Sequence, residues 1–126
     1  MDIHPSVRKL LLDIMKAFPD VGVRMKRRAR AIGSVSFATT EMMNQFSEVT
    51  SEAIRDRKER IARAHLDYVS GLLANGDDKV REYIDVYYVE VLMYDLDDTS
   101  KKWGWSLVPE NLRELYVGMW GRPKFL

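Results

Sequence analysis

The chain has 126 residues, of which 46% are hydrophobic and 31% charged, a balance typical of one globular domain. It contains no cysteine, which excludes disulfides, thiolate catalysis and cysteine-ligated zinc. The net charge is +1, but charged residues are distributed unevenly along the chain. Residues 1–63 hold 13 Lys/Arg against 8 Asp/Glu, giving +5, and residues 64–126 hold 7 against 11, giving −4.

The sequence shows no targeting segment and no membrane span. Charged residues interrupt every apolar run, so none has the length that a bilayer requires. The first residues include an acid where a secretory signal needs bases. We therefore expect a cytoplasmic protein without a membrane partner.

The first predicted helix covers residues 7–18. Pro5 and Ser6 stand where a helix begins, and Pro19 ends it because the residue before a proline avoids helical geometry. Apolar side chains recur along this segment at spacings of three and four: Val7, Leu10, Leu11, Ile14, Met15 and Phe18.

Residues 20–38 give a weaker helical signal, because a narrow apolar stripe runs beside many bases. Residues 33–36 indicate a break in the chain. A helix is expected to restart after Thr39 or Thr40.

The longest predicted helix covers residues 51–73 and ends at Asn75-Gly76, residues that tolerate a left-handed C-cap. Its polar face holds two acid–base pairs at the spacing that favours helical ion pairs: Asp56 with Arg60, and Glu59 with Arg63.

Asp77 is expected to cap a central helix that is apolar nearly all round. The inward stripe of this helix is Val80, Tyr83, Ile84, Tyr87, Val91 and Leu92. Residues 95–105 are expected to form a polar loop, and Pro109 to begin a last helix. The inward residues of that last helix are Leu112, Leu115, Tyr116 and Met119. We therefore expect one compact all-α domain of about five to six helices over residues 1–126.

No motif for catalysis or metal binding is present. Of the two histidines, His4 lies in a terminus expected to fray, and His65 lies on an apolar helix face as a partly buried structural residue. One acidic group lacks the glycine turn and downstream glutamate of a calcium loop: Glu90, Asp95, Asp97 and Asp98. We expect no enzyme activity, no metal and no cofactor.

The most unusual charged segment covers residues 24–30. Five of its seven residues are basic: Arg24, Lys26, Arg27, Arg28 and Arg30. Such a run could meet nucleic-acid phosphates, although it lacks interleaved aromatic residues. The competing interpretation is a solvated helix face. Nucleic-acid association through this run is our alternative function.

Residues 66–92 carry a resemblance to other proteins. The segment combines a helix (Leu66-Asp67-Tyr68-Val69 to Leu72-Leu73-Ala74-Asn75), a Gly76-Asp77 turn, and a helix with an apolar centre and Glu90 near its end. A proline-started helix follows, Val108-Pro109-Glu110-Asn111-Leu112-Arg113. In these features the chain resembles a group of small uncharacterised bacterial helical proteins. They are similar to the immunity proteins that accompany polymorphic and contact-dependent bacterial toxins.

The resemblance implies a binding protein without catalysis that neutralises a toxin by direct contact. The acidic second half offers a candidate surface with six acids within twenty-one residues: Asp78, Glu82, Asp85, Asp95, Asp97 and Asp98. A basic toxin domain would complement this charge. Trp103 and Trp105 could anchor that partner or could cover the core. The acids could equally do no more than solvate the helix.

Overall fold

A computed structural model describes residues 3–33 and 35–126, without the side chains of 35–37. Within these residues the chain forms seven α-helices, one π-helical turn and no strand, so the all-helical prediction is confirmed. The elements are α1 (Pro5–Ala17), α2 (Pro19–Ile32), α3 (Val35–Arg55), α4 (Glu59–Asn75), α5 (Asp78–Ile84), η1 (Asp85–Val89), α6 (Asp98–Trp105) and α7 (Glu110–Trp120).

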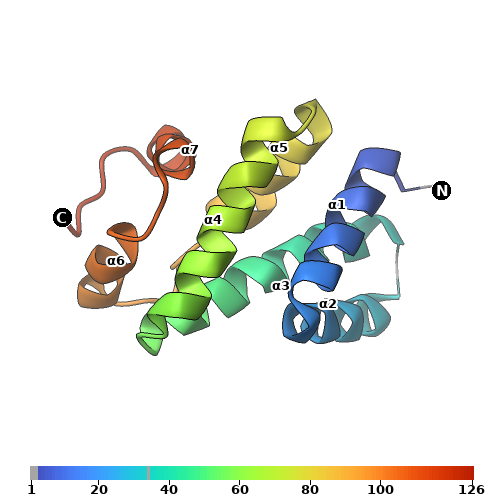
Figure 1. The fold of residues 1–126 in the computed structure, drawn as a ribbon, viewed down its shortest axis with the longest axis horizontal. Coiled ribbons are helices and arrows are strands. Elements are labelled where there is room, and N and C mark those ends of the chain that lie inside the picture. Colours follow the sequence, from blue (N-terminus) through green and yellow to red (C-terminus); the bar gives the residue numbers. More distant parts are fainter. Residues whose placement is uncertain (1–2, 34) are drawn as a thin grey trace.

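The helices are arranged around α3 and α4, which cross the middle of the molecule (Figure 1). Helices α1 and α2 lie at one end, α6 and α7 lie at the other, and the two ends of the chain lie on opposite sides. A continuous buried cluster draws side chains from all these elements, and its largest fully buried residue is Tyr88 on η1.

Helix α2 packs more closely than its sequence suggests. Val21 and Met25 are fully buried, and Pro19 begins this helix as well as ending the one before. Gly33 closes it in the left-handed region at φ 73°. The predicted break at 33–36 is confirmed at Gly33, whereas Ser34 lies outside the described residues.

Helix α3 begins at Val35, earlier than the predicted restart after Thr39 or Thr40. Thr39 is buried inside the helix, and its hydroxyl lies 2.9 Å from the Tyr83 hydroxyl. A threonine that resembles a helix cap in the sequence therefore serves a contact between α3 and α5.

The single helix predicted over residues 51–73 is wrong, because the chain turns between α3 and α4. The Arg57 amide donates to Ile54 O (3.1 Å) and the Lys58 amide to Ala53 O (2.8 Å), which is a Schellman motif. Arg57 occupies the left-handed position at φ 57°, where glycine is usual. Its guanidinium donates to Ile54 O and Ser100 Oγ and lies over the Trp103 ring, 4.9 Å from the centroid.

The turn also rearranges the predicted ion pairs. Glu59 and Arg63 form theirs at 3.5 Å, as expected. Asp56 lies before the start of α4 and pairs with Arg55 at 3.0 Å rather than with Arg60. Gly76 ends α4 in an extended conformation, not a left-handed one. It must still be glycine, because a Cβ there would lie 2.5 Å from Val80 Cγ1.

Asp77 caps α5 as predicted, accepting from the Val80 amide at 3.0 Å. The helix then widens into η1, where the Glu90 amide donates to Asp85 O at 3.1 Å. A π-turn adds one residue to a helical turn and so shifts the buried face. Tyr88 and Val89 are therefore fully buried, whereas Val91 of the predicted stripe is half-buried.

Two serines of α3 form hydrogen bonds with backbone groups in and just after the π-turn. Ser47 Oγ donates to Tyr88 O at 2.7 Å, and Ser51 Oγ accepts from the Met93 amide at 2.8 Å. Met93 is buried with a positive φ of 63°, an uncommon geometry for a residue with a Cβ. Four residues separate the serines, so they lie on one side of α3.

The polar loop predicted over residues 95–105 is wrong, since α6 occupies most of it. Asp97 caps this helix by accepting from the Ser100 amide at 2.8 Å, and this bond lowers the pKa of Asp97. Gly104 lets α6 approach α3, because a Cβ there would lie 2.7 Å from Ile54 Cγ2. In α7, Leu112 is buried as predicted, but Met119 is exposed.

Candidate functional site

Five of the six predicted acids lie at the two ends of the segment formed by α5 and η1. Asp78 and Glu82 are exposed at the start of α5, and Glu82 pairs with Lys79 at 2.9 Å. The other exposed acids follow η1: Asp95, Asp97 and Asp98. At 1.5 Å per helical residue, the length of α5 and η1 separates these groups by roughly 15 Å. Half-buried Asp85 lies between them, and the six do not form one compact patch.

Trp105 covers the core and is not an exposed anchor. Its exposed fraction is 9%, and its ring packs edge-on against Tyr116 at 5.3 Å and Phe125 at 5.9 Å. The Arg113 guanidinium lies over the same ring and donates to Trp105 O at 2.7 Å. The prediction that Trp105 contacts a partner therefore conflicts with its burial, because a docked protein would have to displace these contacts.

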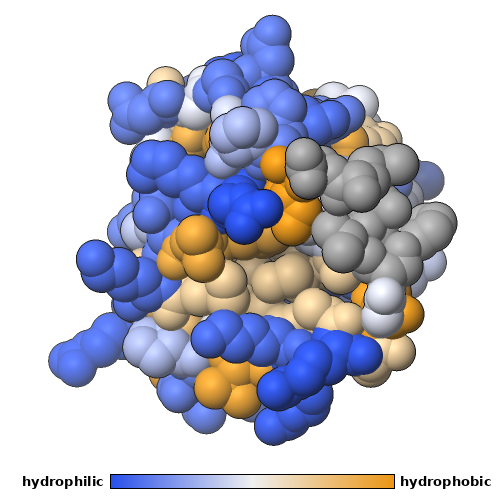
Figure 2. All heavy atoms as spheres, turned by 90° about the vertical axis from the view of Figure 1, so that its right-hand side faces the viewer, coloured by the Kyte–Doolittle hydropathy of each residue, from blue (hydrophilic) through white to orange (hydrophobic). Residues whose placement is uncertain are grey.

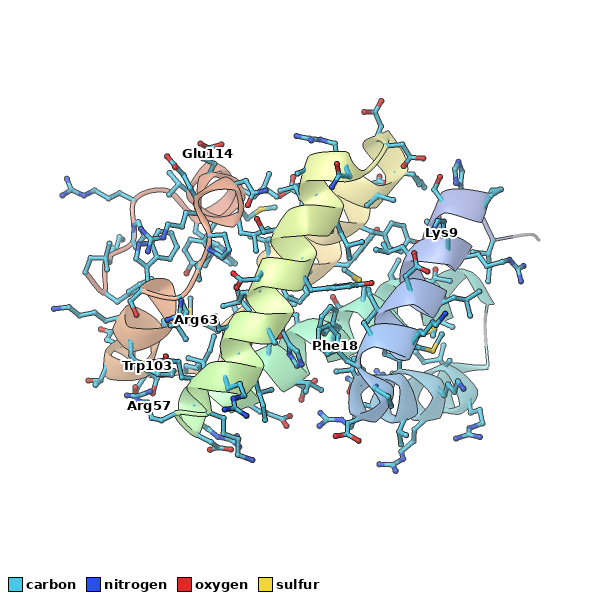
Figure 3. The ribbon with its side chains drawn as sticks, viewed as in Figure 1. Lys9, Phe18, Arg57, Arg63, Trp103 and Glu114 are labelled. Atoms are coloured by element: carbon cyan, nitrogen blue, oxygen red, sulfur yellow. The ribbon has the colours of Figure 1, made fainter. Side chains whose placement is uncertain are left out.

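Trp103 is half-buried on α6 and packs against Arg57 in the turn between α3 and α4. Figure 3 shows its ring beside Arg57, where α6 meets this turn. The Arg57 guanidinium covers one face of the Trp103 ring, so only the rest of this side chain is accessible to a partner.

The exposed aromatic residues lie nearby on α7 and on the turn after η1. Tyr94 is 66% exposed and Trp120 is 49% exposed, with ring centroids 6.3 Å apart. Trp120 Nε1 donates to Glu90 O at 3.1 Å, which fixes the orientation of the indole. Val117 is also exposed and lies three residues before Trp120 on the same helix. We call Tyr94, Val117 and Trp120 the aromatic face.

The sequence contains a signal for part of the aromatic face, although the predicted surface did not include it. Leu112 and Tyr116 form the buried stripe of α7. Val117 and Trp120 lie beside this stripe, in the last turns of the helix. Tyr94 gives no such signal, because it lies in the turn that follows η1, outside any regular helix. Acids and bases mix in the adjoining hollow of about 310 Å³: Glu90, Asp98, Lys101, Arg122 and Lys124.

The basic run of α2 is partly used for packing. The Arg24 guanidinium donates to both carboxylate oxygens of Glu52, at 3.1 and 2.9 Å, which lowers the pKa of Glu52. Arg28 pairs with Glu41 at 3.6 Å. Both partners belong to α3, so two of the five bases help to hold α2 against it. The other three are exposed and make no ion pair within the described residues: Lys26, Arg27 and Arg30.

Arg30 also borders an apolar hollow of about 410 Å³ between α1, α2 and α3. Met15, Ala29 and Met42 line it, and exposed Leu12 adds to its rim. Figure 2 shows this end of the molecule, with hydrophobic surface in the middle and hydrophilic side chains around it. Of the five bases of the run, Arg30 alone borders this apolar depression.

His65 lies in the core and is more deeply buried than the partly buried residue that was predicted, with an exposed fraction of 4%. Its Nδ1 lies 3.0 Å from Thr50 Oγ1, which also accepts from the Tyr88 hydroxyl at 2.9 Å. Burial lowers the pKa of His65 to about 4 and raises the pKa of Tyr88. This neutral network joins α3, α4 and η1 at the centre of the core.

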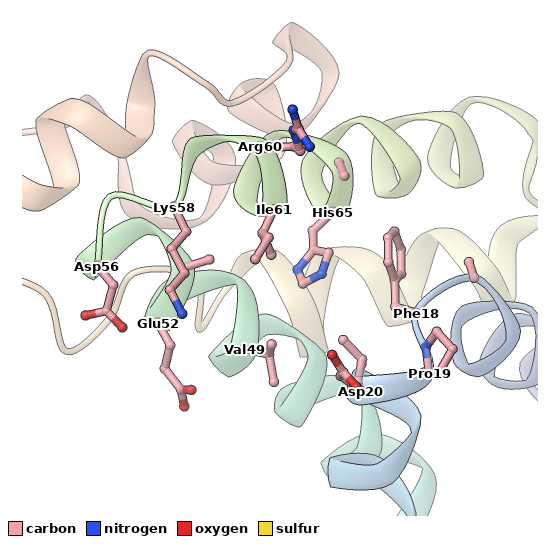
Figure 4. A pocket seen from close by; sticks show the side chains of 14 residues that line it. Phe18, Pro19, Asp20, Val49, Glu52, Asp56, Lys58, Arg60, Ile61 and His65 are labelled. Atoms are coloured by element: carbon pink, nitrogen blue, oxygen red, sulfur yellow. The ribbon is translucent and has the colours of Figure 1, made fainter.

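One side of the His65 ring borders a hollow of about 440 Å³ beside the turn between α1 and α2. Phe18, Val49 and Ile61 form its apolar walls (Figure 4). Charged residues of both signs line it as well: Asp20, Glu52, Asp56, Lys58 and Arg60. The hollow thus combines an apolar interior with one buried polar ring.

These features define a class of protein: a small all-helical domain with an exposed aromatic pair and a buried histidine beside a hollow. None of the described helices has the length and apolar character needed to cross a membrane. The chain belongs to the family described as Domain of unknown function (DUF7674), whose model matches residues 11–121. The match begins within α1 and ends just after α7. No curated protein and no solved structure gave a significant match.

Proposed function

We propose that the protein is a cytoplasmic binding protein without catalysis of its own, which neutralises a bacterial toxin by direct contact as an immunity protein. The aromatic face is the observation that carries this proposal. Tryptophan and tyrosine are enriched at the centres of protein interfaces and among their binding hot spots.

The side chains of the aromatic face are held in place before a partner binds. The Trp120 indole is held by Glu90 O and contacts Tyr94, so less side-chain freedom is lost when a partner binds. Exposed Asp95 follows Tyr94 directly and can attract a basic partner. The resemblance to toxin-associated immunity proteins supports the same function, and a toxin that acts on nucleic acid is expected to be basic.

The test uses the product of a toxin-like gene next to the gene of this protein. We expect Trp120→Ala to speed dissociation by about 30-fold, which corresponds to a hot spot of about 2 kcal/mol. We expect Asp95→Lys mainly to slow association and to reduce its dependence on salt. Both are measured by binding kinetics and by protection of cells from the toxin.

Leu12→Ala is the matched control, because Leu12 is 55% exposed on α1, at the other end of the molecule. It should bind and protect like the parent. If the parent protein neither binds the neighbouring product nor protects cells, the immunity function is contradicted. If the parent protects and folded Trp120→Ala does so equally, only the aromatic face is contradicted.

A further inference from the structure

The hollow beside His65 has the properties of a small-molecule site. Its volume of about 440 Å³ lies within the range of ligand pockets, roughly 300–1,000 Å³. Figure 4 shows His65 projecting from α4 into the space between Ile61, Val49 and Phe18. The Phe18 ring meets the His65 ring edge-on, with centroids 4.6 Å apart, so the end of α1 holds the imidazole in place.

The hydrogen bonds around Thr50 assign the ring proton of His65. The Thr50 hydroxyl donates its only proton to Phe46 O at 3.1 Å and accepts the proton of Tyr88. Its remaining lone pair then faces His65 Nδ1, an arrangement that assigns the ring proton to Nδ1. The other ring nitrogen, Nε2, therefore carries a lone pair and can only accept.

Nε2 makes no hydrogen bond with any of the described residues. Among those same residues, Asn44 Oδ1 is the sole fully enclosed side-chain polar atom without a partner. Nε2 is therefore not enclosed, and it reaches the surface where His65 borders the hollow. Only 4% of His65 is exposed, and its Nε2 acceptor opens into the apolar hollow.

The charges at the rim favour a neutral ligand. Glu52 is held by Arg24 and Asp56 by Arg55, so neither carboxylate is free for a cation. Lys58 and Arg60 contribute positive charge to the rim and Asp20 contributes negative charge, so neither sign of charge dominates. An ionised ligand would lose its hydration in the apolar interior without a dedicated counter-charge.

We propose that this hollow binds a small, neutral, mainly apolar molecule with one hydrogen-bond donor, which donates to His65 Nε2. Phenol and toluene are matched probes, because they are nearly equal in shape and only phenol has a donor. A purely apolar hollow would prefer toluene by about tenfold, since the hydroxyl must lose its hydration. The proposed site should bind phenol at least as tightly as toluene.

The experiment is a nuclear magnetic resonance titration of the ¹⁵N-labelled full chain. The ¹⁵N shifts of His65 should first show that Nδ1 carries the proton. Phenol, and not toluene, should then move the Nε2 resonance. A tenfold preference for toluene, a proton on Nε2, or no binding of phenol up to its solubility limit would each overturn the proposal.

A blocking variant locates the binding without disturbing the core. Ala64 is exposed and lines the hollow, so Ala64→Trp should fill it and reduce phenol affinity at least tenfold. Ala74→Trp is the matched control, because Ala74 is also exposed on α4 but lies outside the hollow, and it should bind phenol like the parent. Equal binding by the two variants would place phenol elsewhere and overturn the assignment.

Discussion

Truncating Ile84 to alanine should lower the free energy of unfolding by about 2–5 kcal/mol, as expected for a fully buried isoleucine. Ile84 is the last residue of α5, at the point where the helix widens into η1. Its side chain is completely covered by the core, which cannot collapse around the missing atoms without moving α3 or α4. Urea unfolding of parent and variant gives the difference.

The same measurement on two valines tests the π-turn. Val89→Ala should cost roughly 2 kcal/mol, because the wide turn buries Val89 completely. Val91→Ala should cost well under half of that, because its side chain is half-buried. A regular helix continuing from Ile84 would place Val91 on the buried face and Val89 off it. The reverse order of losses would therefore show that η1 is absent in solution.

The second large effect concerns His65 and pH. Burial lowers the pKa of this histidine from 6.5 to about 4, so the unfolded chain takes up a proton at a higher pH than the folded protein does. The stabilisation is fully present above pH 6.5 and is lost as the pH falls towards 4. The total loss is about 3 kcal/mol, obtained from the pKa difference.

His65→Leu should remove this slope, and urea unfolding at several values from pH 7 to pH 4.5 measures it. The carboxylates with lowered pKa values titrate below this window: Glu52, Asp56, Asp77 and Asp97. Both proteins should carry His4→Asn, since asparagine keeps a cap at α1 without a second imidazole. Parallel pH profiles would mean that His65 is exposed to water in the folded state.

The sequence predicted helices where apolar spacing, proline and capping residues agree. Helix α1, the Asp77 cap and the end of α4 at Asn75 were all visible in this way. The turn between α3 and α4 was not, because Arg57 takes a position usually held by glycine. The contacts of Arg57 with Ser100 and Trp103 offset the local cost, and they come from a helix more than forty residues away.

The candidate surfaces were harder to predict than the helices. The burial of Trp105 and the exposure of Trp120 depend on how α6 and α7 pack, which the spacing of aromatic residues does not determine. The open acceptor on His65 depends on Thr50 and Tyr88, which lie on two other helices. Only the structural role of His65, as a partly buried residue, could be predicted from its place on an apolar face.

The bond between Ser51 Oγ and the Met93 amide has a consequence for local opening of the chain. In an isolated helix, an amide is released to solvent when its own turn frays, and its deuterium exchange is then fast. The Met93 amide is held by a side chain of α3, so the two segments must separate before exchange occurs. The slow-exchanging core should therefore extend past η1 into residues that no regular helix contains. Met93 should exchange together with the centre of α3, in one cooperative unit.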